Sequence, residues 1–548
     1  MSEEKTTSKK LSWGIFLPPW LIIVAIIALN FINYDAFNLV MGTAQNWILE
    51  NFQWLFNSAT TVAVLLMFIT YLSPVRHVRF GGSKARPMMS YSNYIWIILC
   101  TIMAAGILLW ACAEPMYHMY APAANANVEP GSGGAINFAM NILFLEWTFS
   151  PMAIYGLPAL VFAFVFFNMK KRFAIGSMMT PVLGDAVTTK VTPVVDAICL
   201  FCMCCGMAAS MGSGVLLLSG GICSLTGMEN STLLYIICGS AIVIAFVASA
   251  ASGVMNGIRI LSSINSKVYM VMGLFMLIFG PTAYILDLTC ESIGTYISKF
   301  FEISLMTGAS GGDFWSRWWP SFYMCCWLAW FPTTAVFMGK ISRGYSVKEF
   351  LNVVFLIPSV FSMIWLGLFS GTSIWMELQG FGINEAMQAG GTEAATYAVL
   401  QHLPLAMLTI PLFLVIVFVS FVTAADSNTN AMAGLCTEGL TADDTESPIL
   451  LKFLWGGTTG FLCVLMVCTK GIDGIKQLCN VGGFLNAFIF VVVIVAWIKI
   501  MFNPKKYDTF KEDYDENGRP IPSERLPYEG YDPDKKQFWL TKKLDGVK

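Results

Sequence analysis

Charged residues are scarce in this sequence. Asp, Glu, Lys and Arg make up 12% of the 548 residues, against ~25% in soluble domains. The 32 basic and 34 acidic residues nearly cancel, so the chain lacks the basic face that binding to nucleic acid requires. With 56% hydrophobic residues and a mean hydropathy of +0.66, a water-soluble enzyme is excluded as well. We therefore interpret the chain as a membrane protein with many spans, surrounded by lipid and without a nucleic-acid partner.

Motifs for metal binding and catalysis are missing too. The chain has three histidines, no nucleotide-binding P-loop and no metal-ligand spacing. Four of its 15 cysteines lie within one hydrophobic run, where we favour packing between helices over a metal cluster, whose ligands must converge: Cys199, Cys202, Cys204 and Cys205. The odd number of cysteines, nearly all in apolar runs, argues against a disulfide framework. We expect no enzyme and no metal.

Long apolar runs dominate what is present. A helix needs ~20 apolar residues to cross the ~30 Å hydrocarbon layer, and the sequence predicts twelve such spans: Trp13–Ile32, Gln53–Leu72, Tyr94–Tyr117, Ile136–Phe167, Pro193–Cys223, Thr232–Ala251, Lys267–Leu286, Phe314–Met338, Phe350–Ser370, Met407–Ala425, Leu450–Cys468 and Leu478–Phe502. Loops two, four, six and eight carry Lys and Arg, whereas loops one, three, five and nine carry none. The positive-inside rule then predicts a multi-pass protein of the cytoplasmic membrane with both termini in the cytoplasm.

Small and polar residues interrupt some spans. Span three contains Met103, Ala104, Ala105 and Gly106, span five is rich in Gly, and span ten runs through Thr423 to Asn428. They indicate either close helix approach or backbone opened toward a cavity. Unusual spans five apart predict a five-plus-five inverted repeat, opened by spans three and eight. The expected organisation is a cytoplasmic tail (1–12), two peripheral helices (13–92), a first repeat (93–286), an interfacial helix (287–313), a second repeat (314–502) and a cytoplasmic tail (503–548).

Tryptophan is concentrated where span eight begins, between Phe314 and Pro332. Trp327 and Trp330 are three residues apart and share one helix face, and Trp147 and Tyr155 on span four also lie close to one face. An aromatic face attracts a cation by ~0.5–2 kcal/mol, and a quaternary ammonium cannot donate hydrogen bonds. These residues therefore indicate either a cage for a methylated cation or ordinary aromatic packing at the membrane interface.

The tryptophan-rich block continues through Gly339–Gly344 to Glu349 and Phe350, and there it resembles the signature of the betaine/choline/carnitine transporter (BCCT) family. Glu114-Pro115, Asp196 and the stretch from Thr423 to Ser427 fit the family as well. The resemblance implies an all-α integral membrane fold of twelve transmembrane helices with a five-plus-five core of leucine-transporter type. It also implies alternating-access transport of quaternary-ammonium compounds, usually by homotrimers.

The resemblance also implies a substrate site. Trp147, Tyr155, Trp327 and Trp330 match the cage, Trp319 matches an outer aromatic residue on the entry path, and Tyr117 and Tyr323 are further candidates. Cys326 and Met152 stand where the family usually has Trp, and Met103–Gly106 replaces a glycine-rich stretch. We therefore expect a cage of altered shape, which admits methylated amines other than glycine betaine.

Sodium coupling is weakly supported. Sodium-coupled relatives use a Thr-Ser pair on span ten, where this chain has Thr423-Ala424, and positions matching a second site are Met203 and Met207, poor ligands for a hard cation. Asn265 stands where sodium-independent exchangers have Arg. We favour sodium-independent exchange without a cofactor. The alternative is a coupling Na⁺ at a site that includes Thr423 and Met103.

Four acidic residues lie in or next to spans: Glu114, Glu146, Asp196 and Asp426. We expect three of them to have structural roles, whereas Glu146 stands where the family commonly has His. It points ~100° away from Trp147 around the helix, so contact with the cage is not expected. A carboxylate that did reach the cage would favour choline over a zwitterion.

The sequence therefore predicts a secondary transporter of betaine, choline, carnitine or a related methylated amine. A transporter of an ordinary amino acid or another solute, or an osmolyte uptake system coupled to sodium or protons, remains the alternative. A membrane enzyme acting on lipids has no residue pattern in its favour.

Overall fold

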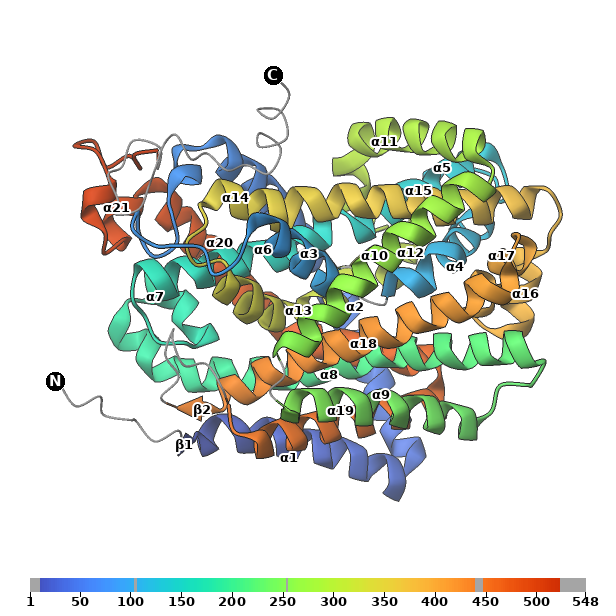
Figure 1. The fold of residues 1–548 in the computed structure, drawn as a ribbon, viewed down its shortest axis with the longest axis horizontal. Helices are drawn as coiled ribbons and strands as arrows, with labels where there is room; N and C mark the ends of the chain where they lie inside the picture. The colour runs from blue at the N-terminus through green and yellow to red at the C-terminus, as the bar shows by residue number, and fades with distance from the viewer. Residues whose placement is uncertain (1–9, 103–105, 253–254, 439–446, 523–548) are drawn as a thin grey trace.

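The chain folds into packed helices (Figure 1). The computed structural model describes residues 10–102, 106–252, 255–438 and 447–522. The helices are α1 Trp13–Ile32, α2 Tyr34–Leu72, α3 Tyr91–Ile102, α4 Gly106–Tyr120, α5 Gly133–Trp147, α6 Phe149–Ala163, α7 Thr180–Leu183, α8 Asp185–Thr226, α9 Thr232–Ser252, α10 Met255–Phe279, α11 Thr282–Ser304, α12 Trp315–Trp318, α13 Pro320–Ile341, α14 Val347–Leu351, α15 Ile357–Leu378, α16 Ile383–Gly390, α17 Ala394–His402, α18 Ala406–Leu435, α19 Ile449–Lys470, α20 Ile472–Phe502 and α21 Pro504–Tyr507. Two short strands, β1 Lys10–Leu11 and β2 Thr437–Glu438, pair antiparallel.

The helices account for the predicted spans, but the count of twelve is not reached. Within the described ranges, ten helices are long and apolar enough to cross a membrane, or eleven if a bent pair forms one span. The bent pair is α10 and α11, which bend by 109° between Phe279 and Thr282. The predicted span Lys267–Leu286 therefore extends past the end of its helix. Helix α11 covers most of the predicted interfacial helix. The predicted third span divides into α3 and α4 on either side of Met103, Ala104 and Ala105, which lie outside the described residues.

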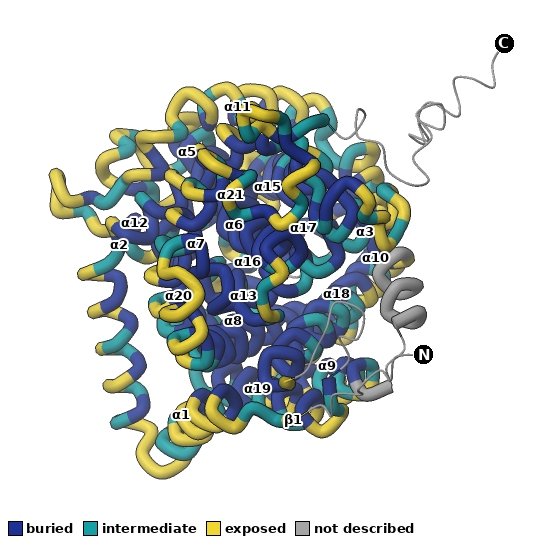
Figure 2. The backbone as a smooth tube through the Cα atoms, turned by 90° about the vertical axis from the view of Figure 1, so that its left-hand side faces the viewer, coloured by how far each residue is buried: buried dark blue, intermediate teal, exposed yellow. Residues whose placement is uncertain are grey.

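The core of the molecule is built around α13, which packs against α6, α8 and α20. Figure 2 shows this centre as buried, with exposed backbone on α1 and α11 at the periphery. Apolar side chains that remain exposed on α1 and α2 suit contact with lipid tails: Leu21, Ile22, Phe31, Ile32, Leu39 and Val40. The most buried helices are therefore the ones that surround the middle of α13.

Small residues in spans five and ten permit close helix approach. A Cβ at Gly206 of α8 would lie 3.1 Å from Ala329 Cβ of α13, and one at Gly214 would lie 2.5 Å from the Phe421 ring of α18. Both α8 and α18 run without a break, and Figure 1 shows them side by side, with α9 and α19 alongside. The small residues of these spans therefore permit close helix packing, and no break opens the backbone of α8 or α18.

The chain breaks instead in the spans that carry the aromatic residues. Helix α5 ends at Trp147, and Thr148 has φ −116° and ψ −112° before α6 begins. Helix α12 likewise ends at Trp318, and Trp319 has φ −126° and ψ −92° before α13. The second break has a local cause, because Pro320 disfavours helical dihedral angles at the residue before it. Each break places a tryptophan at the end of a helix.

Part of the predicted C-terminal tail is ordered. Asp508 is buried and accepts hydrogen bonds from Asn168 Nδ2 (2.8 Å) and the Tyr514 hydroxyl (2.7 Å). Asp513 accepts one from the Ser83 backbone N–H (2.7 Å). Burial raises the pKa of both carboxyls above the ordinary value for Asp. Residues 503–522 therefore dock on the loops that follow α2 and α6.

Candidate substrate site

A pocket lies beside α13, between α4, α6, α8 and α20. Of the residues that the sequence singled out, the lining includes Gly106, Trp147, Met152, Tyr155, Tyr323, Cys326, Trp327 and Trp330. Residues that sequence reasoning missed include Trp110, Phe322, Ser210, Ser213, Ile475, Cys479, Thr101, Thr334 and Ser362. Their only sequence signal is the small-residue character of span five and the apolar character of the other segments.

Four aromatic rings meet at one side of this cavity. The centroid of the Trp327 ring lies 5.0 Å from that of Trp147, 5.7 Å from Tyr323 and 6.0 Å from Tyr155. The Trp147 and Tyr155 rings are close to perpendicular to Trp327, at 73° and 82°. Gly106 allows this packing, because a Cβ there would lie 2.9 Å from the Trp147 ring. The rings come from α5 and α6, which are joined through Thr148, and from α13, which tertiary packing brings against them.

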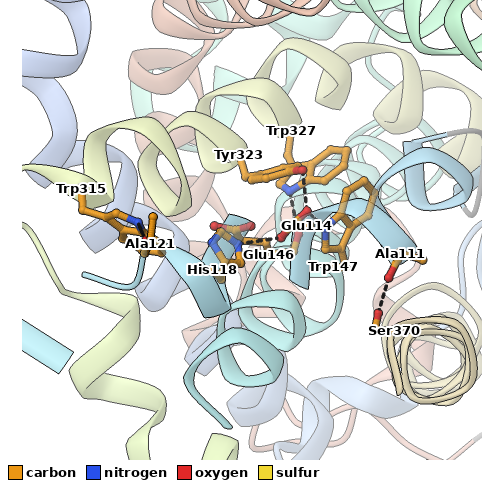
Figure 3. A network of polar contacts seen from close by, with 10 residues as sticks. All are labelled: Ala111, Glu114, His118, Ala121, Glu146, Trp147, Trp315, Tyr323, Trp327 and Ser370. Atoms are coloured by element: carbon orange, nitrogen blue, oxygen red, sulfur yellow. Dashed lines mark hydrogen bonds and ion pairs between the residues drawn. The ribbon is translucent and has the colours of Figure 1, made fainter. Parts of the chain in front are cut away.

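The polar atoms of three rings are held by two glutamates (Figure 3). Glu114 Oε2 accepts hydrogen bonds from Trp147 Nε1 (3.0 Å) and the Tyr323 hydroxyl (2.7 Å). The backbone carbonyl of Glu146 accepts one from Trp327 Nε1 (2.9 Å). Hydrogen bonds to a charged acceptor are the stronger kind, worth ~1.5–3 kcal/mol. Glu114 is thus a positioning residue for the cavity rings.

Glu146 and His118 complete this buried group. The side chain of Glu146 does not line the cavity, as its position around the helix predicted. His118 Nε2 lies 3.3 Å from Glu114 Oε1, and ligand-type atoms of Glu114, His118 and Glu146 all lie within 4.8 Å of one another. Glu114 and His118 are four residues apart on α4, a spacing that places them on one helix face. That spacing is the sequence signal that would have revealed the pair.

Tyr117 and Trp319 lie beyond the cavity wall. The Trp319 ring is 6.0 Å from Trp110, 5.3 Å from Tyr117 and 4.5 Å from His118. The ammonium of Lys476 on α20 lies 4.8 Å from the centre of the Trp319 ring and 5.7 Å from that of Trp110. An aromatic layer with its own cation therefore covers one end of the cavity. The role of Trp319 on an entry path stays a prediction.

The side chains around the predicted ion site make local hydrogen bonds. The Thr423 hydroxyl donates to Val419 O (2.7 Å), one turn back on α18, and the Ser427 hydroxyl donates to Thr423 O (3.0 Å). Asn265 donates to the Ser420 hydroxyl (2.8 Å). Met103, the other residue predicted for this site, lies outside the described residues. Thr423 thus offers a cation one hydroxyl oxygen, and the hydrogen of this hydroxyl is donated to Val419 O.

Comparison with known proteins identifies the class. A family model described as "BCCT, betaine/carnitine/choline family transporter" matches residues 14–506. The chain therefore belongs to the BCCT family of membrane transporters, as the tryptophan-rich block predicted.

Individual relatives have low sequence identity to this chain but align with it over most of their length. The chain is 26% identical over 488 residues to the glycine betaine transporter OpuD of Bacillus subtilis, covering 88% of this chain and 93% of the relative. It is 26% identical over 457 residues to an ectoine/hydroxyectoine transporter of Virgibacillus pantothenticus, with coverages of 83% and 90%. Among solved structures, a Na⁺-coupled sialic acid symporter in a substrate-bound outward-open state matches with a TM-score of 0.42 and 11% identity, over 84% of this chain and 97% of the other.

Proposed function

We propose that this chain is a secondary active transporter of quaternary-ammonium compounds that works by alternating access. The observation that carries the proposal is the convergence of Trp147, Tyr155, Tyr323 and Trp327 on one cavity. Electron-rich ring faces attract a methylated ammonium, and the attraction strengthens where water is excluded. Relatives named for glycine betaine and for glycine betaine, proline and choline support solutes of this kind.

Hydrogen bonding strengthens the case for a cation. Carboxylate acceptors on the indole N–H of Trp147 and on the phenol of Tyr323 polarise these rings and make their faces more negative. A site for the primary ammonium of an ordinary amino acid needs hydrogen-bond acceptors instead, and the ring faces supply none. The quaternary-ammonium substrate is therefore favoured over the amino-acid alternative.

Hydroxyl groups line the cavity on the side away from Trp110. Thr101 and Thr334 each donate to a carbonyl of their own helix, Ile97 O (2.8 Å) and Phe331 O (2.9 Å). Their remaining lone pairs accept hydrogen bonds, so they suit a substrate hydroxyl better than a carboxylate. To bind a substrate carboxylate, one of these hydroxyls would have to break its hydrogen bond to the helix carbonyl. Otherwise the carboxylate would have to bind exposed backbone N–H groups of spans three and eight.

Transport without sodium follows from the residues around Thr423. A sodium ion needs several oxygen ligands. Thr423 offers one hydroxyl, and the side chains of Met203 and Met207, at the positions of the second site, carry no oxygen. We infer exchange of one methylated amine for another, with no cofactor and no catalytic step. The arrangement in the membrane that we infer is a homotrimer in the cytoplasmic membrane, with both termini in the cytoplasm and the two five-helix repeats at 93–286 and 314–502.

Counterflow in liposomes tests the proposal. Vesicles that contain the purified protein are preloaded with one unlabelled compound: glycine betaine, choline, L-carnitine, butyrobetaine or ectoine. The same compound in labelled form is then added outside, in Na⁺ or in K⁺ buffer. We expect accumulation of at least one trimethylated compound, at equal rates in both buffers, with no competition from its primary-amine analogue. Competition by the primary amine at equal strength would support the amino-acid alternative, and a requirement for Na⁺ would refute sodium independence.

A further inference from the structure

Two buried carboxyl groups behind the cavity rings have unequal surroundings. Glu114 on α4 and Glu146 on α5 are 0% and 1% exposed. Glu114 receives hydrogen bonds from Trp147 and Tyr323 and has His118 Nε2 beside its other oxygen. Among the described residues, neither side-chain oxygen of Glu146 has a hydrogen-bond donor. The environment therefore distinguishes the two acids.

Electrostatics then locates a proton. Two carboxylates close together in a low-dielectric interior cannot both be ionised at low cost. Glu114 keeps its charge, because the Trp147 and Tyr323 donors stabilise the carboxylate form. The acid without a donor keeps the proton, and its O–H can then point to an oxygen of its neighbour. In this cluster the proton belongs on Glu146 and the negative charge on Glu114.

Other titratable groups surround the pair, and one of them is the oppositely charged Lys476. Helix α4 contributes His118, α13 contributes Tyr323, and α20 contributes Lys476, whose ammonium lies over the Trp319 ring. Helix α6 contributes Tyr155, which lines the cavity. Helix α11 packs against α5 with Tyr296 next to Thr148 (3.4 Å) and Glu291 next to Asn137 (2.9 Å). Asn137, the partner of Glu291, lies more than two helical turns from Glu146 on α5. The charged groups near Glu146 are therefore Glu114 and Lys476.

The same two residues hold the cavity rings. Glu114 bonds the polar atoms of Trp147 and Tyr323, and the backbone of Glu146 bonds Trp327. A ligand in the cavity is therefore separated from the pair by one layer of aromatic rings. A fixed positive charge at that place favours ionisation of a second carboxyl group, because an opposite charge nearby stabilises the charged form.

We propose that Glu146 is a proton-binding site coupled to the substrate cavity, and that a bound quaternary ammonium displaces its proton. On binding, the O–H bond of Glu146 breaks, the proton passes to the aqueous phase, and the carboxylate remains to balance the ammonium. Linkage is reciprocal, so protonation of Glu146 weakens substrate binding by the same factor. The inference rests on the proposed substrate class and adds a proton that leaves Glu146 when the substrate binds and returns when it dissociates.

A divalent cation is the rival occupant of this cluster. Glu114, His118 and Glu146 each offer one ligand-type atom within 4.8 Å of the others. The atoms of Glu114 and of His118 Nε2 are already engaged in hydrogen bonds, however, and the Lys476 ammonium adds positive charge nearby. A metal ion would require these hydrogen bonds to break, whereas a proton on Glu146 does not. The geometry therefore favours the proton.

Calorimetry on the purified full-length protein tests the coupling. Glycine betaine and choline are titrated in two buffers with different ionisation enthalpies, which counts the protons released, between pH 5 and 9. We expect release of up to one proton, with affinity rising by up to about tenfold per pH unit where Glu146 titrates. Glu146→Gln should bind without releasing a proton at any pH. Glu393→Gln, which alters a buried acid immediately before α17 and outside the cavity, should release the same number of protons as the unaltered protein.

A second measurement needs no variant. Infrared difference spectra of the unaltered protein report the carbonyl stretch of a protonated carboxylic acid, and this band should disappear when choline is added. Binding without proton release, or proton release that persists in Glu146→Gln, would overturn the inference while leaving the substrate class intact. Absence of binding by any methylated amine would refute the proposed function itself. Tight Zn²⁺ binding lost in Glu146→Gln would assign the cluster to a metal and also overturn the proton site.

Discussion

The two ends of the cavity are built in different ways. Helices α3 and α4 run antiparallel to α13, since the Trp110 ring lies 6.0 Å from Trp319 and the Tyr94 hydroxyl lies 2.8 Å from Ser342. We call the end near Trp110 the aromatic end, formed with Trp147, Tyr323, Trp327 and Phe322. The hydroxyl end is formed by Thr101, Thr334 and Ser362.

Their hydrogen bonds differ in range. At the aromatic end, Trp147, Tyr323 and Trp327 bond to residues on other helices, 33 to 209 positions away in sequence. At the hydroxyl end, Thr101 and Thr334 bond within one turn of their own helices. The first end is fixed by tertiary structure, whereas the second can move with its helices. We therefore expect substrate affinity to reside at the aromatic end.

The largest effect should follow loss of the central ring. Trp327→Ala removes the ring that contacts three others, and a cation–π contribution of about 2 kcal/mol corresponds to a loss of affinity of ~30-fold. Labelled-substrate binding to the purified variant measures the loss, and uptake in liposomes should be abolished. Trp327→Phe, the control, keeps an aromatic ring but loses the hydrogen bond to Glu146 O and part of the ring face, so its affinity should fall by less than ~10-fold. Normal affinity in Trp327→Ala would remove the basis for the cage.

A smaller effect should follow loss of the charge that positions the rings. Glu114→Gln keeps the shape of the side chain but turns two charge-assisted hydrogen bonds into neutral ones, a change of ~1.5 kcal/mol in all. Affinity for choline or glycine betaine should fall about tenfold in equilibrium binding. The control is Glu393→Gln, the same chemical change at a buried acid outside the cavity. Equal affinities in the two variants would show that packing alone holds the rings.

The smallest effect on binding should come from the hydroxyl end. Thr334→Val removes a hydroxyl that bonds only to Phe331 O of its own helix, at a cost of about 0.5 kcal/mol. Affinity should change by less than ~3-fold, as measured by competition binding with Thr334→Ser as the control. A loss as large as that of Glu114→Gln would mean that both ends bind the substrate equally, and the comparison would fail.

The sequence predicted the local part of this architecture better than the tertiary part. The apolar runs and the tryptophan-rich block were sufficient for the family and for most helix positions, because both depend on neighbouring residues. The breaks at Thr148 and Trp319 were not predicted, although Pro320 is a signal for the second. The bond from Trp147 to Glu114 joins two helices across a loop, and no periodicity within either helix indicates it.

Glu393 provides a reference that separates stability from substrate binding. It is 4% exposed, its side chain accepts a hydrogen bond from Asn230 (3.2 Å), and burial raises the pKa of its carboxyl to about 7. An acid whose pKa is raised by folding stabilises the fold least when it is ionised. The free energy of unfolding should therefore fall by about 3 kcal/mol as the pH rises from ~4.3 to 7, and stay constant above pH 7. Glu393→Gln should flatten this part of the pH profile of the thermal unfolding midpoint and leave substrate affinity unchanged. A flat profile in the unaltered protein, or altered substrate binding in the variant, would show that this acid is either solvated or linked to the cavity.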